Sequence, residues 1–134
     1  MIDLFSSATP NGKKISIMLE EIGFEYTVKK MDLSKGDQFK EDFKKISPFS
    51  KIPAIIDHSN NKESVFESGA ILIYLAEKSG KFYEKENKLK IDQWLMAQMG
   101  SIGPFIGQYN FFYKFNKGLS EVGEKRYFEM TKKV

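Results

Sequence analysis

The sequence predicts an α/β domain over residues 1–80, followed by a helical domain over residues 84–134. In the first part, short apolar runs alternate with helix-period stretches in the order β-α-β-α-β-β-α. A strand–helix–strand crossover requires parallel pairing, whereas two strands joined by a short turn pair antiparallel. After Gly80 no strand-like run is found. A mixed four-stranded sheet flanked by helices follows, which is a thioredoxin-like arrangement.

The first strand is expected at residues 1–5 (MIDLF), followed by a loop rich in turn-forming residues (SSATPNG). From Lys14 onward the apolar residues follow a helical period, and Gly23 is suited to end that helix. Its apolar face consists of Ile15, Met18, Leu19 and Ile22. The segment YTVKKM, residues 26–31, is expected to form the second strand.

Residues 32–47 are polar, with apolar side chains at helical spacing near the end, so a loop and a short amphipathic helix are expected. IPAIID (52–57) and SVF (64–66) are the third and fourth strands, and residues 67–80 form a helix. Residues 81–116 then form one long helical candidate, which Gly100, Gly103 and Pro104 are expected to kink. Another helix begins near residue 120.

Composition limits the function classes. The chain of 134 residues has no cysteine, which excludes a catalytic thiol of its own, and its single histidine, His58, makes a metal site improbable. The net charge of +3 comes from lysines interleaved with acidic residues, which indicates a solvated surface and no nucleic-acid groove. The longest apolar run, residues 70–76, is far too short to span a membrane, and MIDLFSS is unlike a signal peptide. We therefore expect a cytoplasmic protein without a membrane partner.

Pro53 opens the third predicted strand, although proline has no backbone N–H and is normally kept out of sheet interiors. A cis bond before Pro53 would turn the backbone N–H and C=O of Ile52 outward, where they can pair with an extended peptide. The alternative is a proline that merely stops edge pairing.

Two helix starts carry polar residues suited to a small peptide. In FESGAI (66–71), Ser68 can bind a carboxylate at the helix N-terminus, and Glu67 can hold an adjacent ammonium. In ATPNGKK (8–14), Thr9 and Asn11 offer hydrogen bonds at the positive end of the first helix, where a ligand thiol would be stabilised as thiolate. Simple helix capping and turn formation are the alternatives at both places.

The segments TPNGKK, SPFSKIPAIID, FESGAILIYLAEK and GPFIGQ together resemble the glutathione transferase family. The resemblance is specific to its bacterial Nu-class, disulfide-bond oxidoreductase subgroup, which is related to the yeast nitrogen-regulator prion protein. It covers essentially the whole chain and implies that Thr9 and Asn11 are the catalytic residues beside the glutathione sulfur. It also makes Ile52 the main-chain partner of the glutathione cysteine, and Glu67 and Ser68 the residues that hold the γ-glutamyl end.

The same resemblance makes Pro53 the family's cis-proline and places Gln38 and Lys51 along the glycyl and cysteinyl portions of glutathione. Arg126 resembles a subgroup arginine that contacts glutathione. Many family members activate the thiol with another first-loop residue, so Ser6 and Ser7 are rivals, although the TPNG spacing favours Thr9 and Asn11. The aromatic run at residues 109–115 is either a wall for the second substrate or a core or dimer contact.

The implied activity is thiol–disulfide exchange, in which glutathione supplies the sulfur that the protein lacks and attacks a disulfide. Conjugation of glutathione to an electrophilic small molecule is a close alternative. A glutathione-binding regulatory module with little turnover is another. The resemblance also implies a homodimer. The family's second, all-helical domain is usually as large as the first, so we expect this chain to be a C-terminally truncated fragment.

Overall fold

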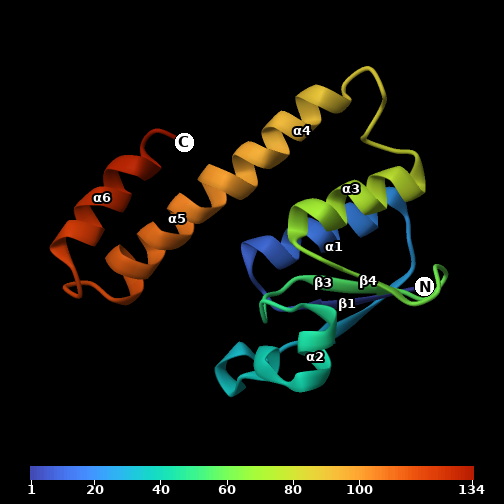
Figure 1. The fold of residues 1–134 in the computed structure, drawn as a ribbon, viewed down its shortest axis with the longest axis horizontal. Coiled ribbons are helices and arrows are strands. Elements are labelled where there is room, and N and C mark those ends of the chain that lie inside the picture. Colours follow the sequence, from blue (N-terminus) through green and yellow to red (C-terminus); the bar gives the residue numbers. More distant parts are fainter. The chain divides into compact units, whose positions relative to one another are not determined.

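The computed structural model describes residues 1–134, which form two compact units, Met1–Glu84 and Lys85–Val134 (Figure 1). In the first unit the elements follow the order β-α-β-α-β-β-α, interrupted only by two short 3₁₀ turns between β2 and α2. The predicted thioredoxin-like fold is therefore confirmed.

The sheet has the strand order β2-β1-β3-β4. Strand β1 (Ile2–Ser6) pairs in parallel with β2 (Tyr26–Lys30) and antiparallel with β3 (Ala54–Asp57), and β3 pairs antiparallel with β4 (Glu63–Phe66). One end of this sheet, which we name the Ser6 end, is formed by Ser6, Lys30, Ala54 and Phe66. The opposite end, named the Asp57 end, is formed by Ile2, Tyr26, Asp57 and Glu63.

Helices cover both faces of the sheet. Helices α1 (Pro10–Ile22) and α3 (Ser68–Ser79) lie side by side and bury the main core against the sheet (Figure 1). Its fully buried side chains include Ile2, Leu4, Ile15, Leu19, Ile55, Ile71 and Leu75. The short helix α2 (Glu41–Ile46) closes a second cluster, in which the Phe5 and Phe43 rings lie 5.8 Å apart.

Two helix starts differ from the sequence prediction. Helix α1 begins at Pro10 and not near Lys14, because Thr9 caps it and proline suits the first helical position, where no N–H is needed. The long helix expected from residue 81 begins only at Lys88. Gly80 ends α3 in the left-handed conformation, and Phe82 also has a positive φ, so the chain cannot run on as a helix there.

The second unit consists of α4 (Lys88–Ala97), α5 (Gly103–Tyr109) and α6 (Glu121–Thr131). A π-helical stretch, Gln98–Ile102, joins α4 to α5, and another, Asn110–Phe115, follows α5. The interruption expected at the glycines and Pro104 is thus a widened, π-helical turn. It lies just before Pro104, which has no backbone N–H to donate. No helix of the structure is both long and apolar enough to cross a membrane.

Aromatic stacking holds α6 against the preceding helical segment. Tyr109 stacks on Tyr113 with ring centroids 5.0 Å apart, and both rings contact Phe128 of α6. Phe112 stacks on Tyr127 at 5.6 Å. These contacts favour a packing role for part of the run 109–115. Phe115, by contrast, is 72% exposed.

Candidate functional site

The Ser6 end of the sheet gathers the chain segments that carry most of the predicted site residues. Thr9 and Asn11 follow the end of β1, and Gln38 follows the end of β2. The segment 51–53 leads into β3, and the pair at 67–68 follows the end of β4. Because the register brings these strand ends together, four separate loops meet at one end of the sheet. Arg126 is exposed on α6 in the second unit.

The start of α1 offers unused hydrogen-bond donors. Thr9 caps the helix, and its Oγ1 accepts from the Gly12 N–H at 3.1 Å, which leaves the hydroxyl hydrogen available to donate. Asn11 is exposed at the second helical position, where a backbone N–H has no partner within the helix. The helix dipole adds partial positive charge at this point. Such a setting stabilises a thiolate.

Gly12 allows α1 to begin close to β1. It is buried, and a Cβ at this position would collide with Ser6 Oγ and lie 2.6 Å from the Ser7 carbonyl oxygen. Any larger residue would therefore push the start of α1 away from the strand end. The sequence predicts a turn at this glycine and does not reveal its packing role.

The two rival serines differ in their availability. Ser6 is buried, and its hydroxyl donates to the Ser7 carbonyl oxygen at 3.2 Å. The Ser7 carbonyl also accepts from the Thr9 N–H at 2.7 Å, which shapes the turn that leads into α1. The Ser6 hydroxyl is thus committed to this turn, which makes Ser6 the weaker of the two rivals; Ser7 is half-buried and uses its backbone carbonyl here.

The peptide bond between Ile52 and Pro53 is cis, as expected from the sequence. Pro53 is buried and Ile52 is half-buried beside it. The loop before them is braced by Ser47, whose buried hydroxyl donates to the Lys51 carbonyl at 2.8 Å and accepts from the Lys51 N–H at 3.3 Å. Ser47 supports the site through a tertiary contact that no sequence pattern indicates. The Lys51 side chain itself is exposed.

Glu67 has an unusual backbone conformation, with φ 70° and ψ 119°. A residue with a Cβ rarely adopts this region, and such outliers concentrate at functional sites where the surroundings enforce them. The Glu67 side chain is exposed and makes no capping hydrogen bond to α3. Ser68 is buried as the first residue of α3. A carboxylate and a helix N-terminus therefore lie next to each other, as an amino-acid zwitterion requires.

Gln38 lies in the 3₁₀ turn Asp37–Phe39. Its Nε2 donates to the Leu33 carbonyl oxygen over a long 3.4 Å, whereas its Oε1 is buried without a hydrogen-bond partner. Buried acceptors of this kind are uncommon in folded proteins.

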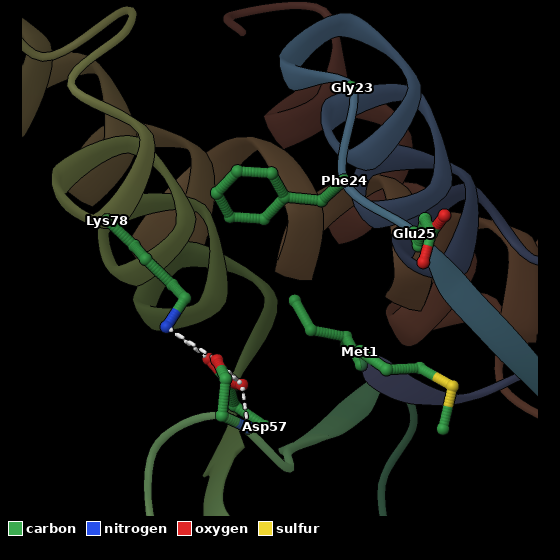
Figure 2. A pocket seen from close by; sticks show the side chains of 8 residues that line it. Met1, Gly23, Phe24, Glu25, Asp57 and Lys78 are labelled. Carbon is green, nitrogen blue, oxygen red and sulfur yellow. Dashed lines mark hydrogen bonds and ion pairs between the residues drawn. The ribbon is translucent and has the colours of Figure 1, made fainter.

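A different kind of polar cluster occupies the Asp57 end (Figure 2). Asp57 is fully buried and accepts hydrogen bonds from Lys78 Nζ at 2.9 Å, Tyr74 OH at 2.7 Å and Ser59 Oγ at 2.7 Å. Burial alone would raise the pKa of Asp57, but these bonds, led by that from Lys78, outweigh it and hold the pKa far below its usual range. The cluster ties β3 to α3 beside a pocket of about 280 Å³, which Met1 and Phe24 also line. None of the predicted glutathione residues lies there.

No group of three or more His, Asp or Glu side chains converges in a way that could hold a metal ion. The polar groups at the Ser6 end are instead donors at a helix start, a backbone segment at a cis-proline and a carboxylate. This arrangement suits a small anionic peptide that carries its own sulfur.

Comparison with known proteins finds similar sequences and structures. Residues 2–77 match the family model "Glutathione S-transferase, N-terminal domain". The disulfide-bond oxidoreductase YfcG of Escherichia coli is 50% identical over 118 residues, which cover 84% of this chain and 55% of that protein. The transcriptional regulator URE2 of Saccharomyces cerevisiae is 34% identical over 98% of this chain and 40% of its own.

A solved structure is also similar to the chain. The glutathione transferase family member from Pseudomonas fluorescens, crystallised with two glutathione molecules bound, superposes with a TM-score of 0.90 at 45% identity. The match covers 98% of this chain and 61% of that protein. The chain spans about half the length of the curated relatives it matches. Its thioredoxin-like sheet, its helical second unit and these matches together show that the chain belongs to the glutathione S-transferase family.

Proposed function

We propose that the complete protein is a glutathione-dependent thiol–disulfide oxidoreductase. The observation that carries the proposal is the set of unused donors at the start of α1, in a chain that has no cysteine. These 134 residues supply no sulfur nucleophile, so we infer that the donors serve a thiolate that arrives with the ligand. The disulfide-bond oxidoreductase name of YfcG supports the same reaction class.

Glutathione is held by several segments of the Ser6 end. The Glu67 carboxylate takes the ammonium of the γ-glutamyl group, and Ser68 takes its carboxylate at the N-terminus of α3. The backbone of Ile52, ahead of Pro53, pairs with the cysteinyl residue like an added strand. Gln38 and Lys51 serve the remaining cysteinyl and glycyl portions. Arg126 is proposed as a further glutathione-binding residue on the strength of the resemblance.

The reaction needs two glutathione molecules for each disulfide reduced. The thiol of the first loses its proton to solvent, and donors from Thr9 and Asn11 stabilise the resulting thiolate. The thiolate attacks one sulfur of the substrate disulfide, so that a mixed disulfide forms and the other sulfur leaves as a thiolate. A second glutathione thiolate then attacks the mixed disulfide, which releases oxidised glutathione and the second substrate thiol. Lowering a thiol pKa from about 8.5 by two units requires roughly 2.7 kcal/mol, within the range of two good hydrogen bonds and a helix terminus.

The proposal is tested by giving the complete protein reduced glutathione and either a small symmetrical disulfide or an aryl halide. Formation of oxidised glutathione is followed through glutathione reductase and NADPH consumption, and conjugate formation through its ultraviolet absorbance. We expect disulfide reduction above the uncatalysed rate, with loss of activity in Asn11→Ala. Conjugation without reduction would establish the transferase alternative. Binding of glutathione without either reaction would establish a regulatory module, and both results would overturn the oxidoreductase proposal.

We also propose that the complete protein is a cytoplasmic homodimer. The reducing cytoplasm supplies the glutathione that the reaction consumes. Trp94 and Met96 on α4 are 66% and 56% exposed in the single chain. Large apolar side chains that are exposed together are typical of a surface that another protein chain covers. Together with α3, this helix is the proposed dimer contact. Sedimentation of the complete protein as a monomer at micromolar concentration would refute the dimer.

A further inference from the structure

Lys14 makes a contact that the proposed reaction does not yet use. It is half-buried on α1, and its Nζ donates to Asn11 Oδ1 at 2.9 Å, one helical turn away. Partial burial removes water from the Lys14 ammonium and lowers its pKa, because the charged form is less well solvated there. The neighbouring Lys13 is exposed and makes no side-chain hydrogen bond. The two lysines thus carry the same charge on the same turn, but only one of them touches Asn11.

The contact decides which end of the Asn11 amide faces outward. An asparagine side chain has an oxygen that accepts and an NH₂ group that donates, and a half-turn about its last bond exchanges them. A thiolate needs the donor. An ammonium can only donate hydrogen bonds. Lys14 therefore donates to the Oδ1 end of Asn11 and is repelled by its NH₂ end. With Oδ1 held in this way, the NH₂ group remains for a ligand.

We propose that Lys14 is a positioning residue, whose ammonium holds the Oδ1 end of Asn11 so that the Asn11 NH₂ group is presented to the sulfur of bound glutathione. The inference rests on the proposed function, in which Asn11 donates to that sulfur. Lys14 acts through Asn11 and does not itself touch the substrate.

A double-mutant cycle on the complete protein tests this coupling. The thiol pKa of bound glutathione and the saturated rate of disulfide reduction are measured in the wild type, in Asn11→Ala, in Lys14→Met and in the double variant. Lys14→Met is expected to raise the thiol pKa and to lower the saturated rate about two- to tenfold, the range for one weakened hydrogen bond. In the Asn11→Ala background the same substitution should change little. Lys14→Arg, which keeps the charge and the donors, should restore most of the loss.

Lys13→Met is the matched control, because it removes the same charge from the same turn without touching Asn11. It should leave the thiol pKa and the rate near the wild-type values. An equal effect of Lys13→Met and Lys14→Met would show that general charge, and not the contact, matters. Equal effects of Lys14→Met in both backgrounds would show that Lys14 acts directly on the sulfur, and either result overturns the inference.

The cycle also separates this inference from the function on which it rests. If Asn11→Ala raises the thiol pKa but Lys14→Met does not, only the positioning role fails. If Asn11→Ala itself changes neither the pKa nor the rate, the proposed activation by Asn11 fails, and the role of Lys14 fails with it.

Discussion

Glu67 combines backbone strain with a proposed binding role, so replacing it should change stability and affinity in opposite directions. A residue with a Cβ at φ 70° and ψ 119° costs about 1–3 kcal/mol, which glycine avoids. Glycine also makes the unfolded chain more flexible, and this conformational entropy lowers the free energy of unfolding by roughly 0.5–1 kcal/mol. Glu67→Gly should therefore raise the free energy of unfolding by about 0–2.5 kcal/mol. Loss of the carboxylate should weaken glutathione binding by about 1.5–3 kcal/mol, or roughly 10- to 150-fold in Kd.

The assay pairs urea unfolding with calorimetric titration of glutathione on the same preparations. Glu67→Gln retains the Cβ and therefore the strain, so it should lose affinity without gaining stability. Lys62 also has a positive φ, 56°, but lies in the β3–β4 turn toward the Asp57 end, so Lys62→Gly should affect stability alone. A Glu67→Gly protein that is destabilised by more than 1 kcal/mol and binds glutathione normally would refute the reasoning.

Three further predictions concern the supporting structure. Gly12→Ala should lower the free energy of unfolding by about 1–3 kcal/mol, measured in urea, because its Cβ would collide with Ser6 Oγ. Thr9→Val should cost about 1 kcal/mol of stability through the lost cap and should also raise the thiol pKa of bound glutathione, and Thr9→Ser should restore both. The folded-state pKa of Asp57 lies below its unfolded value of about 3.9, so its contribution to stability is present above about pH 4 and lost as the pH falls further. Asp57→Asn should accordingly flatten the acid limb of a plot of unfolding free energy against pH.

The fold was predictable because apolar spacing determines element type, and element order limits the topology. The mixed four-stranded sheet, the helix that ends at Ile22 and the helix at 68–79 follow from periods that the sequence displays directly. The late start at Lys88 was missed, because positive φ at Phe82 is not visible in a helical apolar pattern. Boundaries depend on such single backbone conformations more than on the pattern itself.

The site was predictable where a residue's role depends on its chemical type, and not where it depends on a tertiary contact. The positions of Thr9 at a helix start and Pro53 at a strand start were readable from the sequence. The close approach of Gly12 to Ser6 was not, because two elements must first be packed together. The contact between Lys14 and Asn11 has the spacing of helical neighbours, but a sequence does not tell which of two adjacent lysines turns toward the asparagine.

The most direct test of the central claim is the thiol pKa of glutathione bound to the complete protein, followed through the ultraviolet absorbance of the thiolate as pH is varied. Donors at the start of α1 should bring it to about two units below the value of about 8.5 for an ordinary thiol. Asn11→Ala should return it part of the way. A bound thiol that titrates at or above 8.5 in the wild-type protein, unchanged by Asn11→Ala, would contradict the account.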